Sequence, residues 1–243
     1  MSNLFSNLGI NSEIQQRLSD IQIVNPTDIQ KKVIPVFLSQ TEDVVALAKT
    51  GTGKTAAFGL PLIQLIDPKN TAIQAVILAP TRELGQQIHT NLESFAAHSP
   101  EVSIAVICGG IPIKPQIDRL KATTHIVVAT PGRLADLVKR GEAIDLSNIQ
   151  YFILDEADEM VSALKEGLDS IIKVIPKKRR TLLFTATLSG AIKQMVNNYM
   201  ATAVVHLEAD MKTLGHQGID HQYVIVEPIE KLEVLLHFLN TKE

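Results

Sequence analysis

The sequence predicts a three-layer α/β fold, in which helices cover both faces of a mostly parallel central sheet. Short apolar runs recur along the chain and do not alternate with polar residues, which indicates strands buried on both faces. Longer segments with helical periodicity separate these runs, a pattern typical of βαβ units. The chain has 243 residues, of which 45% are hydrophobic and 20% are charged, so it can bury a core large enough for such a fold.

Seven apolar runs are the expected strands of the sheet. They span residues 44–47, 75–78, 104–107, 126–129, 152–154, 182–184 and 204–205. Helical periodicity predicts helices that include residues 54–66, 82–97 and 191–200. We therefore expect one large domain over residues 1–209, which begins with two further helices and no strand in residues 2–38.

The segment after residue 209 departs from this alternation. Residues 210–221 are polar and contain glycine, which predicts a linker. A strand is expected over residues 222–226, and four leucines give the following segment an apolar stripe at helical spacing, namely Leu232, Leu235, Leu236 and Leu239. Because little sequence follows to cover that stripe, we interpret residues 222–243 as the first elements of a second domain that this sequence does not complete.

Composition limits the classes of function. The net charge of −3 and the low aromatic content, 4% without tryptophan, argue against nucleic-acid binding through bulk positive charge or base stacking. Any contact with nucleic acid must then use local donors to phosphate. The single cysteine, Cys108, excludes an internal disulfide and fits a cytoplasmic location. The first ten residues contain no basic residue, so no signal peptide is expected. No run is long and apolar enough to cross a bilayer, so no membrane-spanning segment is expected either.

A phosphate-binding loop is expected between the first strand and the helix that follows it. This P-loop reads Ala48-Lys49-Thr50-Gly51-Thr52-Gly53-Lys54-Thr55. Gly51 and Gly53 allow backbone N–H groups to turn toward phosphate oxygens, and the helix adds the positive end of its dipole. Lys54 supplies a charge for the β- and γ-phosphates, and Thr55 supplies a hydroxyl for Mg²⁺. The alternative is an ordinary glycine-rich turn with an exposed lysine.

A pair of carboxylates follows the expected strand over residues 152–154. The strand runs directly into Asp155-Glu156-Ala157-Asp158, and adjacent carboxylates at a buried strand end are costly unless cations or strong donors pair with them. Because the carboxyl ends of parallel strands form the ligand crevice, the pair is expected beside the phosphate loop. Asp155 would hold the magnesium shell and Glu156 would orient the attacking water as general base. The alternative is an acidic helix N-terminus, where the negative charges interact favourably with the helix dipole.

These residues resemble a known family. Asp155-Glu156-Ala157-Asp158 is the signature that names the DEAD-box ATP-dependent RNA helicases, and the resemblance covers nearly the whole chain. Further motifs occur in the family's order: Phe5 with residues 26–30 as the Q motif, the P-loop, Pro80-Thr81-Arg82-Glu83-Leu84, Gly109-Gly110, Thr130-Pro131-Gly132-Arg133 and Thr185-Ala186-Thr187. The resemblance implies a RecA-like P-loop NTPase domain over residues 1–209, with a Q-motif region in residues 1–38.

The resemblance implies hydrolysis of ATP coupled to local opening of RNA duplexes, with ATP and Mg²⁺ as cofactors. The implied catalytic residues are Lys54, Asp155 and Glu156, and Thr55 and Asp155 would hold the metal. The implied nucleotide-binding residues are Gln30, Thr50, Gly51, Thr52, Gly53, Lys54 and Thr55. Gln30 would recognise the adenine edge. Thr27 and Gln30 also fit a capping box for the helix that follows, and both roles are expected together.

The resemblance also implies contacts with RNA phosphates and ribose. The residues concerned are Thr81, Arg82, Gly110, Thr130, Gly132 and Arg133. Threonines at the junction of a strand and a helix leave hydroxyls and N–H groups free for phosphate, and arginines add charge-assisted donors. Such contacts hold a strand without reading its sequence. Simple helix capping is the alternative for these segments.

Coupling between the two sites is assigned by the resemblance to the motif after the sixth strand. Thr185 and Thr187 would hydrogen-bond the acidic motif at Asp158, and the alternative is a loop of small residues. The family usually has serine at the position of Thr185. It also has a glycine and an aromatic residue where this sequence has Gln22 and Ile23, so apolar contact would replace ring stacking on the adenine.

Other expectations concern partners and rival classes. The motifs of the family's second helicase domain are absent from this sequence, so we expect that domain as a partner and weak ATP binding with little hydrolysis without it. The rivals are a non-catalytic RNA- or partner-binding module, a small-molecule P-loop kinase and a DNA translocase. A kinase needs a lid, and no insertion is present to build one. The basic residues 177–180 are expected in a solvated turn, and Cys108 is expected in the core.

Overall fold

The computed structural model describes residues 4–141, 144–161, 164–201, 203–209 and 223–241. The chain divides into two compact units, Met1–Asp210 and Met211–Glu243. The first unit contains a seven-stranded sheet in which all neighbouring strands are parallel. The predicted three-layer α/β fold is therefore confirmed, and its sheet is fully parallel.

All seven predicted strands are present. They are β1 (Asp43–Leu47), β2 (Ala75–Leu78), β3 (Ile104–Ile107), β4 (Ile126–Ala129), β5 (Tyr151–Leu154), β6 (Arg180–Thr185) and β7 (Val204–Glu208). Their order across the sheet is β3-β4-β2-β5-β6-β1-β7. The loops that follow β1 and β5 therefore leave the same edge of the sheet and are separated by one strand, β6.

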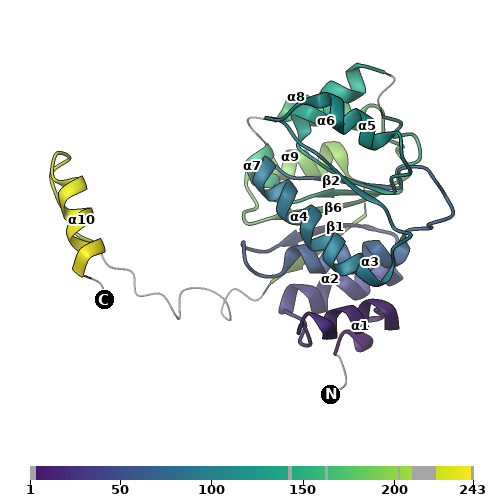
Figure 1. The fold of residues 1–243 in the computed structure, drawn as a ribbon, viewed down its shortest axis with the longest axis horizontal. Helices are drawn as coiled ribbons and strands as arrows, with labels where there is room; N and C mark the ends of the chain where they lie inside the picture. Colours follow the sequence, from purple (N-terminus) through teal and green to yellow (C-terminus); the bar gives the residue numbers. More distant parts are fainter. Residues whose placement is uncertain (1–3, 142–143, 162–163, 202, 210–222, 242–243) are drawn as a thin grey trace. The chain divides into compact units, whose positions relative to one another are not determined.

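Helices cover both faces of the sheet (Figure 1). One face carries the 3-10 helices η1 (Leu4–Leu8) and η2 (Ala96–His98) with α1 (Ser12–Asp20), α2 (Asp28–Ser39), α3 (Lys54–Leu65) and α4 (Arg82–Phe95). The other carries α5 (Ile113–Leu120), α6 (Pro131–Lys139), α7 (Ala157–Met160), α8 (Lys165–Ile172) and α9 (Gly190–Tyr199). In the part of the chain that is described, no helix is long and apolar enough to cross a membrane.

Alternate residues of one strand enter different cores. Val44 and Ala46 of β1 pack into the core beneath α1–α4, whereas Val45 packs into the core beneath α5–α9. Both faces of the strand are thus buried against helices, which explains why the strand sequences are continuously apolar. Cys108, which follows β3, is buried as predicted.

The basic cluster before β6 differs from its prediction as a solvated turn. Arg180 is the first residue of β6 and is only 7% exposed, and its guanidinium lies 5.0 Å from the ring centroid of Phe37. Arg179 lies over the ring of Phe152 and donates hydrogen bonds to the carbonyls of Pro176 and Tyr199. The prediction was wrong for both arginines, because carbonyl acceptors and aromatic faces, most of them far away in sequence, compensate for their burial.

The second unit is described only over residues 223–241. The predicted helix is present as α10 (Lys231–Thr241), and its leucines are exposed, with Leu232 at 68%. The predicted strand over residues 222–226 was wrong, since residues 223–226 have no regular secondary structure. A strand needs hydrogen-bonding neighbours, and none pairs with this segment in the described part of the chain. The predicted linker, residues 210–221, lies outside the described residues.

Candidate functional site

The phosphate loop joins β1 to α3 and has the backbone geometry that its glycines allow. Gly51 and Gly53 adopt φ angles of +77° and +89°, in the left-handed region that disfavours side chains. Thr52 is buried, and its hydroxyl donates to the carbonyl of Lys49 at 2.8 Å, so it stabilises the loop. Ala48 N–H donates to the carbonyl of Thr185 in the neighbouring strand at 2.9 Å. These two hydrogen bonds close the loop on itself and attach its start to β6.

Lys54 brings the loop and the acidic motif together. Its ammonium nitrogen lies 3.4 Å from Asp155 Oδ1 and 3.8 Å from Glu156 Oε1. The nitrogen is buried and makes no well-oriented hydrogen bond in the structure. A buried ammonium group with unused donors is costly, and a phosphate oxygen beside it would satisfy those donors.

The first two carboxyl groups of the acidic motif differ in burial, because the side chain of Asp155 is 2% exposed and that of Glu156 is 24% exposed. Burial raises the pKa of Asp155, while the positive charge of Lys54 acts in the opposite direction. Burial also raises the pKa of Glu156, and Lys54 again opposes this, while Asp155 adds to it. Glu156 adopts φ 51° and ψ 52°, a conformation that is strained for a residue with a side chain. Its N–H donates to Asp155 Oδ1 at 3.0 Å, which helps to hold this geometry.

Gln30 connects α2 to the phosphate loop. Its side-chain oxygen accepts a hydrogen bond from Thr27 N–H at 2.9 Å, the reciprocal half of a capping box. Its amide nitrogen donates to the carbonyl of Gly53 at 3.0 Å. The cap therefore fixes the rotamer of Gln30 at the edge of the loop, and one amide hydrogen remains for another acceptor.

A cleft of about 510 Å³ lies over these groups. Eight of the predicted nucleotide-site residues line it, namely Gln30, Thr50, Gly51, Gly53, Lys54, Thr55, Asp155 and Glu156. Ile23 also lines it, and sequence reasoning missed Ile21 and a wall formed by α4, with Leu84, Gln87, Asn91, Ser94 and Phe95. The spacing of Gln87 and Asn91 places them on one face of α4, but nothing in the sequence indicated that this face lines a cleft.

A second hollow, of about 600 Å³, collects residues from three loops at the carboxyl ends of β2, β3 and β4. Five of the six residues predicted to contact RNA line it, namely Arg82, Gly110, Thr130, Gly132 and Arg133. The sixth, Thr81, caps α4 beside it, and its hydroxyl accepts from Leu84 N–H at 3.2 Å. The parallel sheet thus brings three distant motifs to one place.

Donors in this hollow are partly unused. Arg133 donates through Nη2 to the carbonyl of Ile111 at 2.9 Å, but its buried Nη1 has no partner. Gly110 has a φ of +77°, and a Cβ there would lie 3.4 Å from Arg82 Nη1. The Thr130 hydroxyl accepts from Gly109 N–H at 3.1 Å. Arginine donors and a close-lying glycine backbone suit a phosphate-bearing ligand.

The acidic motif contacts the loop after β6 through Asp158. Asp158 Oδ2 lies 3.4 Å from the Thr187 hydroxyl and 3.3 Å from Ala186 N–H, which both donate to it. Thr185 differs from expectation, because it is fully buried and its hydroxyl donates to the carbonyl of Thr187 at 2.9 Å. Its position at the end of β6 turns it toward its own loop. Ala186 N–H donates to Asp158 in place of the Thr185 hydroxyl, a contact that the sequence could not reveal.

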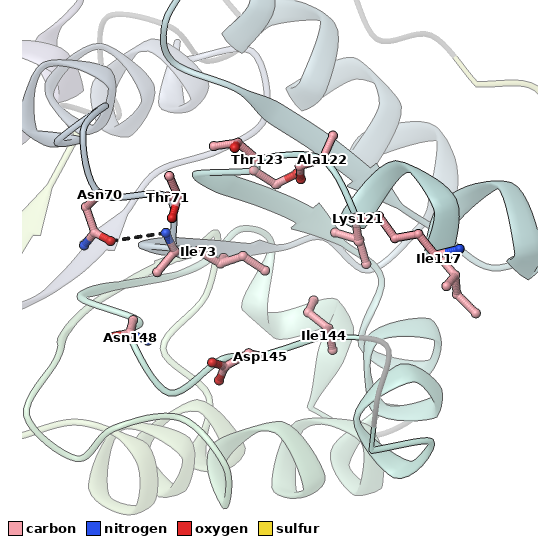
Figure 2. A pocket seen from close by; sticks show the side chains of 13 residues that line it. Asn70, Thr71, Ile73, Ile117, Lys121, Ala122, Thr123, Ile144, Asp145 and Asn148 are labelled. Atoms are coloured by element: carbon pink, nitrogen blue, oxygen red, sulfur yellow. Dashed lines mark hydrogen bonds between the residues drawn. The ribbon is translucent and has the colours of Figure 1, made fainter.

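A third hollow, larger than these two, lies at the amino ends of β2, β4 and β5, with a volume of about 700 Å³ (Figure 2). Its polar groups are partly used locally: Asn70 accepts from Ala72 N–H at 3.2 Å, and the Thr124 hydroxyl donates to the carbonyl of Ala122. Ligands of open parallel sheets bind beyond the carboxyl ends of the strands, which is the opposite end. The two smaller hollows, at the carboxyl ends of the strands, are therefore the candidate functional site.

Comparison with known proteins agrees with this geometry. A family model described as DEAD/DEAH box helicase matches residues 27–195. The Probable ATP-dependent RNA helicase MJ0669 of Methanocaldococcus jannaschii is 40% identical over 240 residues, which are 98% of this chain and 63% of that protein. The DEAD-box ATP-dependent RNA helicase CshA of Streptococcus pneumoniae is 39% identical over 240 residues, 98% of this chain and 45% of that protein.

Solved structures give the same result. The crystal structure of a DEAD box protein from Methanococcus jannaschii matches with a TM-score of 0.79 at 39% identity, over 98% of this chain and 64% of that one. Saccharomyces cerevisiae Dbp5 bound to RNA and ADP BeF3 matches with a TM-score of 0.75 at 28% identity, over 84% and 51%. The chain spans less than two thirds of the length of each of these relatives. Its fold is a RecA-like helicase domain, and the chain belongs to the DEAD/DEAH box helicase family.

Proposed function

We propose that this chain is the half of an ATP-dependent RNA helicase that binds ATP·Mg²⁺ and the RNA backbone. The observation that carries this proposal is the position of Lys54, whose buried ammonium lies between two carboxylates above a glycine loop and has unused donors. A triphosphate chelated to a divalent cation supplies both acceptors for the lysine and a counter-charge for the acids.

The residues of the cleft have distinct roles in this proposal. Lys54 and the backbone N–H groups of the P-loop hold the phosphates, and Thr55 and Asp155 would hold Mg²⁺, which neutralises charge on the transferred phosphoryl group. Glu156, with its raised pKa, orients the attacking water and takes its proton. The remaining amide hydrogen of Gln30 donates to the adenine edge. Positioned charge supplies most of the rate enhancement.

RNA occupies the hollow that Arg82, Gly110 and Arg133 line. Because these donors face phosphates, the interaction is independent of base sequence, and contacts to the 2′-hydroxyl favour RNA over DNA. Asp158 belongs to the same motif as Asp155 and bonds the loop after β6, so it couples nucleotide state to RNA binding. A net charge of −3 is compatible with this, because the donors are local.

A second helicase domain is the proposed partner, and the cytoplasm the proposed location. Each relative compared is longer than this chain, and Dbp5 was solved with RNA and a nucleotide analogue. The charge that the second domain contributes around the γ-phosphate is needed for turnover. We therefore expect weak ATP binding and little ATPase activity from the chain alone.

The proposal is tested by ATP hydrolysis with the chain joined to a second helicase domain. We expect RNA, but neither DNA nor small metabolites, to stimulate hydrolysis, and Glu156→Gln to lower hydrolysis by at least about 10²-fold while RNA binding persists. Equal stimulation by DNA would indicate a DNA translocase. Wild-type RNA binding without any hydrolysis, unchanged by Glu156→Gln, would instead support a non-catalytic module.

A further inference from the structure

Arg180 holds a helix that leads to the nucleotide cleft. It donates three hydrogen bonds, from Nη1 to the carbonyl of Phe37 at 2.7 Å, from Nη2 to that of Val36 at 3.0 Å and from Nε to that of Glu42 at 2.8 Å. The first two acceptors belong to the last turn of α2, and the third lies in the loop between α2 and β1. All three bonds join residues more than 130 positions apart in sequence.

The last turn of α2 needs such a partner. The final four carbonyls of a helix have no N–H partner within the helix. The carbonyl of Val36 accepts from Gln40 N–H at 3.0 Å just beyond the end of α2, and Arg180 adds a second donor to it. A cation at this end also interacts favourably with the negative end of the helix dipole. α2 has no basic residue in its own last turn, so Arg180 from β6 supplies that charge. A planar guanidinium can bond several carbonyls at once and also stack on Phe37, which a lysine cannot do.

Both segments that Arg180 holds lead to the nucleotide cleft. α2 has 12 residues and is therefore about 18 Å long, and its third residue is Gln30, which bonds the carbonyl of Gly53. β1 continues directly into the P-loop. The helix is thus fixed at one end by Gln30 and at the other by Arg180. A change in the position of the Arg180 end would tilt the helix and move Gln30 relative to the loop.

Resting on the proposed function, we propose that Arg180 is a positioning residue for nucleotide recognition, which keeps Gln30 at the phosphate loop by anchoring the far end of α2. It touches no nucleotide itself. Its loss changes the affinity for ATP and the preference for adenine, in addition to any loss of stability.

Arg179 offers a matched control. It is the neighbouring residue, it is half-buried where Arg180 is buried, it donates to two carbonyls, and it stacks on an aromatic ring, Phe152. Its partners, however, lie on the opposite face of the sheet, in the core beneath α5–α9. Substitution of Arg179 should therefore lower stability in a similar way without moving α2.

The experiment is a calorimetric titration of the chain with Mg·ATP and Mg·GTP, well below the melting temperature of each variant. We expect Arg180→Gln to weaken ATP binding about fivefold, the equivalent of one lost hydrogen bond, and to reduce the preference for ATP over GTP. If Arg180→Gln does not fold, Arg180→Lys is measured in its place. It keeps the charge but not the planar guanidinium, and it should show the same trend. Arg179→Gln should bind both nucleotides as the wild type does.

A double-mutant cycle with Gln30→Ala decides whether the effect passes through Gln30. We expect Arg180→Gln to add nothing to the loss caused by Gln30→Ala, because both substitutions remove the same contact. Additive losses of ATP affinity in the double variant would overturn this inference but not the proposed function. So would an ATP affinity of the Arg180 variants equal to that of Arg179→Gln. Failure of the wild-type chain to bind Mg·ATP would overturn the proposed function and this inference together.

Discussion

The ammonium nitrogen of Lys54 lies 3.4 Å from Asp155 Oδ1, and both side chains are almost fully buried, at 7% and 2% exposure. Lys54 opens α3 after the loop that follows β1, and Asp155 directly follows β5; these two strands lie on either side of β6. An ion pair buried in this way contributes little to stability, since desolvation offsets most of its attraction. Under the proposed function this arrangement is a preformed site, in which the lysine would bind phosphate and the acid would hold a metal.

Replacing Lys54 by methionine should make the chain less stable in a pH-dependent way. Burial raises the pKa of Asp155 above its ordinary value of 3.8, so the folded state binds its proton more tightly and stability is lost as pH rises through the folded pKa. Without the opposing charge of Lys54 this loss grows. Thermal unfolding at pH 8 should show a destabilisation of about 3 kcal/mol relative to wild type, and a smaller one near pH 4.

The control for this prediction is the double variant Lys54→Met with Asp155→Asn, which has no titratable side chain at position 155. Its difference from wild type should grow less with pH than that of the single variant, and what remains should come from Glu156, which Lys54 also contacts. If Lys54→Met were destabilising by the same amount at every pH, the charge of Lys54 would not be coupled to the titration of Asp155.

Substituting Glu156 by glutamine should stabilise the ligand-free chain while removing activity. Burial raises the pKa of Glu156 above 4.5, so its carboxylate costs stability at neutral pH, and the gain from glutamine should disappear as pH falls below 4.5. ATP hydrolysis, measured with a second helicase domain present, should fall by about 10²- to 10⁴-fold, as for loss of a general base. A melting temperature at pH 7.5 that drops on substitution would contradict the stability half of this prediction.

Gln22 occupies a backbone conformation that suits glycine. Its φ is +60°, and the family that this sequence resembles usually has glycine there. Because the left-handed region costs a side-chain-bearing residue about 1–2 kcal/mol, Gln22→Gly should raise the free energy of unfolding by roughly 1 kcal/mol in urea denaturation. Gln16→Gly, at an exposed position within α1, should instead lower it by about 1 kcal/mol, because glycine is unfavourable inside a helix.

Ile23 lines the nucleotide cleft as an apolar residue without a ring. If the adenine packs there, Ile23→Phe should tighten ATP binding by about tenfold, since stacking of a base on an aromatic ring contributes roughly 1–3 kcal/mol. Val24→Phe is the control, because Val24 is exposed and lies outside the cleft lining. Equal affinities of the two variants would place the adenine away from Ile23.

Asp158 and Thr187 should determine how RNA affects ATP use. Thr187→Val removes a hydroxyl that donates to Asp158, whereas Thr185→Ser keeps the hydroxyl that donates to the carbonyl of Thr187. We expect Thr187→Val to leave ATP affinity unchanged but to reduce RNA stimulation of hydrolysis severalfold. Thr185→Ser should lower stability by about 1 kcal/mol, for one buried methyl group, with coupling intact. Reduced RNA stimulation in Thr185→Ser, with normal stimulation in Thr187→Val, would assign the coupling to Thr185.

Much of the fold could be predicted from the sequence, because its signals are local. Continuous apolar runs marked all seven strands, and helical periodicity placed α3, α4 and α9 to within two residues at their ends. The strand expected over residues 222–226 failed because a single apolar run does not specify a pairing partner. Strand identity depends on hydrogen bonds to another segment, which local pattern does not contain.

Residues of the candidate site could be predicted where they belong to short sequence motifs. They could not be predicted where segments that are distant in sequence meet only in the folded chain. The loop of Lys54 and the acid Asp155 were found from residue type and position after a strand. The burial of Arg180 was missed, because the acceptors that satisfy it lie in the last turn of α2 and beyond. The α4 wall with Gln87 was missed for the same reason, since α4 faces the cleft only after α3 and α4 pack together.

The most direct measurement is a calorimetric titration of ATP into the wild-type chain and into Lys54→Met, each with and without Mg²⁺. We expect one ATP to bind per wild-type chain, more weakly after chelation of Mg²⁺, and no detectable binding to Lys54→Met at the same concentrations. Equal binding by the two proteins, or binding by wild type that is indifferent to Mg²⁺, would contradict a shared phosphate and metal site between Lys54 and Asp155.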